Sequence, residues 1–137
     1  MANITIFTDG GARGNPGPAG AGAVVYQGKK RIAEVSKFLG ARTNNWAEYE
    51  ALILALEAAQ NALGKKIPGV VVKMDSELIV KQMKGEYRVK DPALKEQHAK
   101  ARTLIEKSFP SISFTHIPRE QNGEADKLAN DAMDRGK

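Results

Sequence analysis

The order of strand-like and helix-like segments limits this chain to a mixed α/β fold. Strand patterns come first, and helical patterns then alternate with further short strands. A tight GKK turn joins the second strand to the third, which predicts an antiparallel meander. Strands separated by helices pair in parallel, so the sheet is expected to be mixed, with helices packed on it. The opening strands are expected at residues 3–8, 20–27 and 31–39.

Helices are indicated by apolar residues at helical spacing and by residues that end a helix. The clearest is NNWAEYEALILALEAAQNALG, in which Tyr49, Leu52 and Leu56 share one face and Gly64 provides a stop. The sequence contains no internal repeat. The remaining elements are two short strands and three helices, expected at 70–74 and 112–117, and at 75–85, 91–108 and from near Asn122 onward.

Composition indicates one compact domain, residues 1–137, with a polyanionic partner. The chain is 42% hydrophobic, enough for one core, and has no cysteine for disulfides or thiolate metal sites. No apolar run approaches the roughly 18 residues of a membrane span, and the first residues lack the zones of a signal peptide. We therefore expect a cytoplasmic protein without a membrane partner. Lys and Arg outnumber Asp and Glu by 21 to 16, a net charge of +5, which favours a polyanion.

The glycine-rich stretch TDGGARGNPGPAGAG does not fit a nucleotide-phosphate loop. Two prolines remove N–H donors, and a strand pattern rather than a helix follows. We expect instead a wide turn between two strands, with Asp9 at its entrance.

Four acidic residues occupy comparable places along the chain. Asp9 ends the first strand and Asp75 follows the fourth, while Glu48 and Asp126 lie in the first turns of helices. In an open α/β sheet, strand ends and helix starts converge on one crevice, where sites are usually built. The four acids are therefore candidates for one site.

Each acid also has a purely structural explanation. Asp9 can form an Asx turn, Glu48 can complete a capping box with Asn45, Asp75 or Ser76 can cap a helix, and an acid at a helix start favours the dipole. Such caps and turns are commoner than ligands for any one residue. The joint placement of all four favours the site.

Four motifs carry a family resemblance: FTDGGARGNPGPAGAGAV, TNNWAEYEALILAL, MDSELIVKQM and PREQNGEADKLANDAM. In their order and spacing the chain resembles the type 1 ribonucleases H over nearly its whole length. The resemblance implies a mixed five-stranded sheet in the order 3-2-1-4-5 with helices on both faces. It also implies an enzyme that cuts the RNA strand of RNA–DNA hybrids, with Asp9, Glu48, Asp75 and Asp126 as its catalytic carboxylates.

Phosphodiester hydrolysis explains why such a site needs carboxylates. Two cations about 3.5 to 4 Å apart serve the attacking water and the leaving 3′ oxygen, and Mg²⁺ prefers hard oxygen ligands. We expect two Mg²⁺ ions, with Mn²⁺ as an alternative, and products with 5′-phosphate and 3′-hydroxyl ends. Asp9 is the candidate to bridge both ions. The resemblance assigns Glu48 and Asp75 to one ion and Asp126 to the other.

Substrate contacts are expected around the glycine loop. Without Cβ atoms, Gly10 and Gly11 let the RNA backbone approach the main chain. For Asn44 and Asn45, helix capping alone is the alternative. Glu77 stands where some relatives carry an amide, and a carboxylate there can only accept hydrogen bonds. The resemblance further implies that Thr43 contacts a phosphate of the DNA strand. It also implies base-edge or sugar contacts at Asn15, Asn44 and Asn45.

The chain departs from better-known bacterial relatives after KQM, where KGEYRVKDPAL is too short for their basic helix and loop. A substitute phosphate track is expected at Lys84, Arg88 and Lys90. Two lysines farther on, Lys95 and Lys100, fit a solvated helix face better. Aromatic Trp46 is expected to pack at the start of its helix, and His98 to be a surface residue.

The residue that assists near the last aspartate stays open between two candidates. His116 has the family spacing to Asp126 but alternates in phase with Phe114, whereas Arg119 stands in the loop itself. A second reading of the whole chain is a catalytically idle nucleic-acid-binding module, and a third is a DNA nuclease or transferase. The intact acidic quartet opposes the idle module, because a pure binder gains nothing from negative charge beside phosphate. No obligate protein partner is evident, and a monomer is expected.

Overall fold

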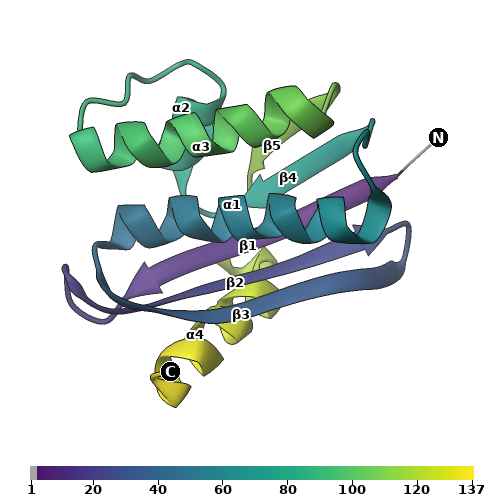
Figure 1. Ribbon diagram of the computed structural model, residues 1–137. Helices are drawn as coiled ribbons and strands as arrows, with labels where there is room; N and C mark the ends of the chain where they lie inside the picture. Colours follow the sequence, from purple (N-terminus) through teal and green to yellow (C-terminus); the bar gives the residue numbers. More distant parts are fainter. Residues whose placement is uncertain (1–2) are drawn as a thin grey trace.

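The computed structural model describes residues 3–137 and arranges them as one sheet with helices on both faces (Figure 1). A short 3-10 turn, η1 (Arg119–Gln121), precedes the last helix. The strands are β1 (Ile4–Ala12), β2 (Gly17–Gln27), β3 (Lys30–Arg42), β4 (Val70–Met74) and β5 (Ile112–His116). The helices are α1 (Asn44–Leu63), α2 (Glu77–Met83), α3 (Pro92–Ser108) and α4 (Gly123–Arg135).

The sheet has the order β3-β2-β1-β4-β5. The first three strands pair antiparallel as a meander, whereas β4 pairs in parallel with both β1 and β5. This confirms the mixed sheet in the order 3-2-1-4-5. The parallel pairing matters for function, because it brings the carboxyl ends of β1 and β4 to the same end of the molecule.

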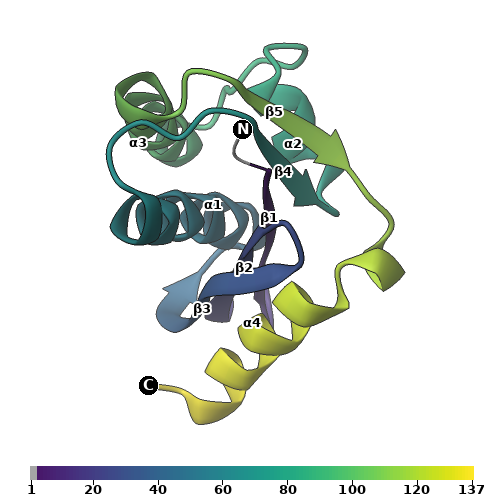
Figure 2. The same ribbon diagram turned by 90° about the vertical axis from the view of Figure 1, so that its right-hand side faces the viewer.

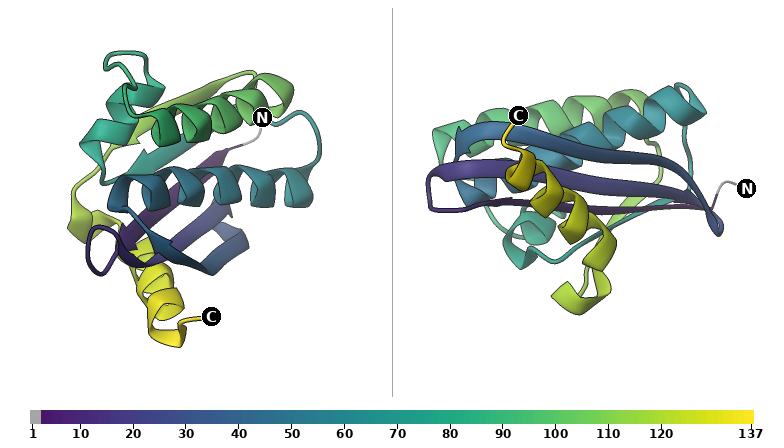
Figure 3. Two further views of the ribbon diagram at one scale, coloured as in Figure 1. Left: turned by 60° about the vertical axis from the view of Figure 1, so that its left-hand side comes forward. Right: turned by 90° about the horizontal axis from the view of Figure 1, so that it is seen from below.

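Helices cover the two faces of the sheet unequally. Figure 2 shows α1 and α3 side by side on one face and α4 on the other. Seen from below, α4 crosses β1, β2 and β3 obliquely (Figure 3). Among residues 3–137 no helix is both long and apolar enough to cross a membrane.

Strand β2 is unusually small in its side chains because α4 lies directly against it. A Cβ built on Gly22 would come within 2.2 Å of the carbonyl oxygen of Ala125, and the facing residues Ala125, Ala129 and Ala132 are fully buried or nearly so. Close backbone approach requires glycine at such a contact. The AGAGA stretch of residues 19–23 thus lets α4 lie directly against the sheet.

The first strand is longer than the sequence predicted. It continues through Ala12, and Asp9 pairs with Gly22 within the ladder. The prediction that Asp9 ends its strand and opens a wide turn is therefore wrong. Glycine has low strand propensity by itself, but here two glycine- and alanine-rich segments pair with each other. The turn shortens to residues 13–16.

Candidate active site

Three carboxylates from three separate elements meet at the carboxyl end of the parallel strands. Oxygen atoms of Asp9, Glu48 and Asp75 all lie within 4.8 Å of one another. The register explains two of them, because Thr8 pairs with Met74, and the residue that follows each of these is an aspartate. Since these strands run parallel, the two aspartates emerge side by side.

Helix α1 adds Glu48 to this pair through a buried hydrogen bond. The Gly10 N–H donates to Glu48 Oε1 at 3.0 Å, and the side chain is only 6% exposed. The alternative explanation of Glu48, a capping box with Asn45, is wrong, because Thr43 caps α1 by accepting from the Trp46 N–H. The side chain of Glu48 instead points at the sheet.

Close packing of α1 on β1 makes this contact possible. A Cβ on Gly10 would lie 2.2 Å from the Ala47 carbonyl oxygen, so glycine there is required by the helix. At Gly11 a Cβ would meet nothing nearer than Asn44 Oδ1 at 3.4 Å. Two glycines were expected to let a nucleic-acid backbone approach. Only Gly11 has free space where its Cβ would lie, because the same space at Gly10 is filled by α1.

The two buried acids, Asp9 and Glu48, hold protons more tightly than free carboxylates do, so their pKa values are raised. Burial raises the pKa of Asp9 to about 9, and the charges of three neighbouring carboxylates, first that of Glu48, add to the rise. Burial likewise raises the pKa of Glu48 to about 8, although the Gly10 N–H and the Arg119 charge oppose it. At neutral pH the group therefore favours either bound protons or a bound cation.

Asp126 joins the cluster from the opposite face of the sheet. It is half-buried in the first turn of α4 and lines one pocket with Asp9, Glu48 and Arg119. This pocket has a volume of about 370 Å³. All four predicted acids therefore converge, three of them within ligand distance and Asp126 beside them.

Asn122 is a site residue that the sequence analysis missed. It is 1% exposed, and its Nδ2 donates to the Thr8 carbonyl at 2.9 Å and to Asp75 Oδ2 at 3.4 Å. The side chain thus ties the start of α4 to both strands that carry aspartates. In sequence it precedes a helix and looks like a cap, yet it makes no side-chain cap bond.

Arg119 and His116 differ in their placement. Arg119 lies in η1 and lines the acidic pocket. His116 is exposed at the end of β5, opposite Met74, and does not line that pocket. Its phase with Phe114 is as predicted, although the strand end leaves it outside the core. The geometry favours Arg119.

The predicted substrate-contact residues form a polar rim next to the acids. Asn15 Oδ1 accepts from the Asn44 N–H at 3.0 Å, and Asn44 Oδ1 accepts from the Ala12 N–H at 3.1 Å. These bonds join the β1–β2 turn to α1. Because Thr43 is the cap, capping does not explain Asn44 and Asn45. Asn15, Thr43 and Asn45 line a neighbouring pocket of about 260 Å³.

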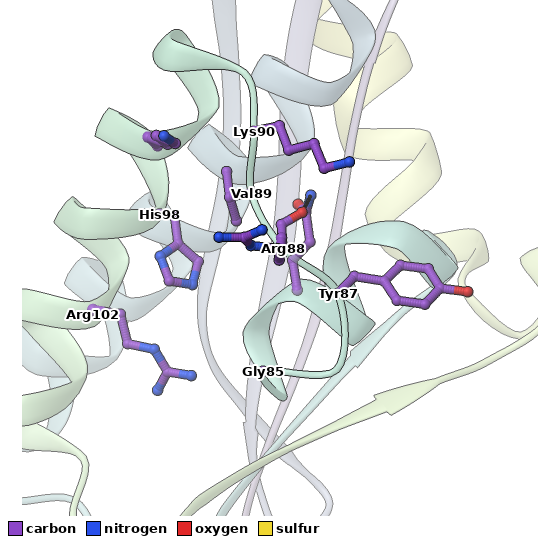
Figure 4. A pocket seen from close by; sticks show the side chains of 9 residues that line it. Gly85, Tyr87, Arg88, Val89, Lys90, His98 and Arg102 are labelled. Carbon is purple, nitrogen blue, oxygen red and sulfur yellow. Dashed lines mark hydrogen bonds between the residues drawn. The ribbon is translucent and has the colours of Figure 1, made fainter.

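The predicted basic track is only partly assembled. Lys84 lies 4.0 Å from Glu86, whereas Arg88 and Lys90 line a separate cleft between the α2–α3 loop and α3 (Figure 4). Lys100 is exposed and not among the lining residues. Glu77 is exposed as the first residue of α2.

Helix α3 adds side chains to this cleft that were not predicted from the sequence to lie there. Lys95 lines the cleft in addition to being exposed on the helix surface. Arg102, which was not predicted, lines it as well. His98 is half-buried in the cleft, with its ring edge-on to Tyr49 at 6.2 Å, so its prediction as a plain surface residue is wrong. Trp46 is half-buried against the core as expected.

Comparisons with known proteins agree with this geometry. The profile of the family described as reverse transcriptase-like matches residues 7–132. "Ribonuclease HI" from Halobacterium salinarum is 43% identical over 96% of this chain and 64% of its own length. "Bifunctional protein Rv2228c" from Mycobacterium tuberculosis is 45% identical over 96% of this chain, which spans only 35% of that relative.

A solved structure matches nearly the whole chain. It is LC11-RNase H1 in complex with an RNA/DNA hybrid, with a TM-score of 0.92 and 50% identity. The match covers 97% of this chain and 98% of that one.

Proposed function

The chain belongs to the type 1 ribonuclease H family, and we propose that it is a metal-dependent endonuclease that hydrolyses the RNA strand of RNA–DNA hybrids. The convergence of Asp9, Glu48, Asp75 and Asp126 at one end of the sheet carries the proposal. The hybrid complex of a 50% identical protein supports the substrate class. The proposed catalytic domain spans residues 1–137 and acts as a monomer.

The donor set fits divalent metal ions of the hard kind. The clustered ligand atoms are carboxylate oxygens, and no histidine lines the acidic pocket among the described residues. Such donors suit Mg²⁺, with Mn²⁺ as an alternative. Asp9, Glu48, Asp75 and Asp126 would hold two ions. When bound, they would supply an activated water and stabilise charge on the leaving 3′ oxygen.

The chain's own groups prepare the site for an anionic phosphodiester. The Gly10 N–H fixes Glu48, and the Asn122 amide fixes Asp75, so both carboxylates are oriented before substrate arrives. Arg119 adds a cationic side chain to the pocket that Asp9, Glu48 and Asp126 line, where it can contact a phosphate oxygen. The products carry 5′-phosphate and 3′-hydroxyl ends.

The polar rim is the proposed hybrid contact. Gly11 leaves space beside the acids, and side chains from the β1–β2 turn and the start of α1 lie next to it. RNA is distinguished from DNA by its 2′-hydroxyl, which amide groups can contact. Glu77 can only accept from such a hydroxyl. The rim residues are Asn15, Thr43, Asn44 and Asn45.

A cleavage assay tests this function directly. Labelled RNA–DNA hybrid, duplex RNA and duplex DNA are incubated with Mg²⁺, Mn²⁺ or chelator, and product ends are mapped. We expect the hybrid alone to be cut, in its RNA strand, and only with metal. Asp131→Asn is a matched control, because Asp131 lies on α4 but pairs with Lys127 at 2.9 Å. Binding without cleavage would favour the idle module, and cutting of duplex DNA would indicate a DNA nuclease.

A further inference from the structure

A cationic cleft lies apart from the carboxylates, between the loop of residues 84–91 and α3 (Figure 4). Its volume is about 650 Å³, within the range typical of small-ligand pockets. Half-buried His98 lies at its wall. The cationic side chains that line it come from the loop and from α3, namely Arg88, Lys90, Lys95 and Arg102.

The charge in this cleft is uncompensated within the described part of the chain. No acidic side chain lines the cleft, and none of its four cations forms an ion pair there. Elsewhere Arg13, Arg31 and Lys127 all have carboxylate partners. Several unpaired cations around one hollow repel one another, and a bound anion removes that repulsion.

The cleft is held in shape by a buried amide. Gln82 is 5% exposed; the Tyr49 hydroxyl donates to its Oε1 at 2.7 Å, and its Nε2 donates to the Arg88 carbonyl at 3.2 Å. The N–H groups of Glu86 and Tyr87 both donate to the Lys81 carbonyl. The loop that carries Arg88 is thus fixed before any ligand binds, which lowers the entropy cost of binding.

Helix α1 connects the cleft to the acidic site through one hydrogen bond. Tyr49, which holds Gln82, directly follows Glu48 on α1. Both the α2–α3 loop and the start of α1 lie at the same end of the molecule (Figure 1). The acidic site and the cleft thus lie toward the same end of the molecule, as a strand that contacts both requires.

We propose that this cationic cleft is a second phosphate-binding site, which takes the phosphodiester backbone of the hybrid away from the position of cleavage. The proposal rests on the proposed function and extends it to α3 through Lys95 and Arg102. Guanidinium groups suit this task because they bind phosphate oxygens in pairs. The ligand group is a phosphate, which a free nucleotide could also supply, so the test separates the two sources.

The salt dependence of hybrid binding tests whether the phosphate in the cleft belongs to a nucleic-acid strand. The Asp9→Asn chain in chelator is titrated with fluorescein-labelled hybrid over about 50 to 200 mM salt, where phosphate contacts set the log–log slope. Arg88→Ala and Lys95→Ala should each flatten that slope by about 0.7 to 0.9. Lys29→Ala, the same loss of charge in the β2–β3 turn at the opposite end, should leave it unchanged (Figure 1). Arg88→Lys, which keeps the charge, should retain the slope.

A free phosphate compound is the other possible ligand of the cleft. To test it, inorganic phosphate and adenosine 5′-monophosphate are titrated by calorimetry into the same protein variants. Unchanged slopes in both alanine variants would overturn the proposal. Tight binding of the mononucleotide together with unchanged slopes would overturn it too, in favour of a free anion. Flattened slopes with no cleavage of hybrid by the unmodified chain would leave the cleft supported and the nuclease function refuted.

Discussion

The carboxylate site and the cationic cleft lie at the same end of the protein but are built in opposite ways. The acids come from β1, α1, the end of β4 and α4, and the innermost of them are buried. The cleft is formed by residues 82–102, a continuous stretch whose cations are exposed or half-buried. Buried like charges oppose folding, whereas exposed charges are screened by solvent. The first site therefore lowers the stability of the metal-free protein, whereas the repulsion among the exposed cations of the second is weak.

Catalysis should separate the two regions most strongly. Asp9→Asn and Glu48→Gln should each lower the turnover of RNA–DNA hybrid by several orders of magnitude, because each removes a proposed metal ligand. Arg88→Ala should lower kcat/KM only severalfold and mainly through KM, since it removes binding shared by ground and transition states. Steady-state kinetics, with Asp131→Asn as control and circular dichroism for folding, measure this. Near wild-type turnover in Asp9→Asn would remove the proposed mechanism.

A substitution that disturbs the packing of α1 on β1 beneath the acids should give the next largest effect, a loss of folding stability. Gly10→Ala should destabilise the protein by at least about 1–3 kcal/mol, because its Cβ would meet the Ala47 carbonyl oxygen at 2.2 Å. Gly11→Ala is the matched control and should cost less, since its nearest contact is 3.4 Å away. Denaturant melts of the two variants give the difference. Equal stability would mean that α1 does not hold Glu48 against β1 as described.

Protonation of the acids should make the stability of the metal-free protein depend on pH. The folded pKa values, about 9 for Asp9 and about 8 for Glu48, exceed the unfolded values near 4. The folded state therefore binds more protons between these limits, and the free energy of unfolding falls as pH rises from about 4 toward 9. Added Mg²⁺ should restore stability at neutral pH, because it binds the native state.

The amide variant tests the same repulsion at fixed pH. In chelator at pH 7, Asp9→Asn should be more stable than the unmodified chain by at least about 1 kcal/mol, close to the equivalent of one pKa unit. In Mg²⁺ this order should reverse, since the variant loses a ligand. Thermal melts under both conditions provide the measurement. A variant that is less stable in chelator would show that Asp9 is a structural residue.

The cleft should give the smallest change in stability. Arg88→Ala should alter the free energy of unfolding by no more than about 0.5 kcal/mol, as is usual for exposed side chains without partners. Urea melts at low and high salt would detect a larger effect. A loss well beyond this value would mean that Arg88 supports the fold, and the contrast between the two regions would fail.

The sequence alone determined the order of elements and the identity of the acids. Hydrophobic periodicity is a local property, so the helix that ends before Gly64 and the strand over 70–74 could be predicted directly from the sequence. The four acids were recognisable because strand ends and helix starts converge in this type of sheet. The resemblance supplied the strand order, which local patterns do not contain.

Only the tertiary structure decided what holds those acids in place. Glu48 is fixed by the N–H of Gly10, 38 residues away, and Asn122 by the carbonyl of Thr8, 114 residues away. Pairing of the glycine-rich segments of β1 and β2 keeps Asp9 inside a strand, whereas strand propensity predicted that the strand ends before the glycines. The folding of α3 back onto the α2–α3 loop likewise brought Arg102 and Arg88 to one cleft. Hydrogen bonds and charge contacts depend on distance in space, and residues far apart in the chain acquire a distance only when the sheet and its helices have closed around them.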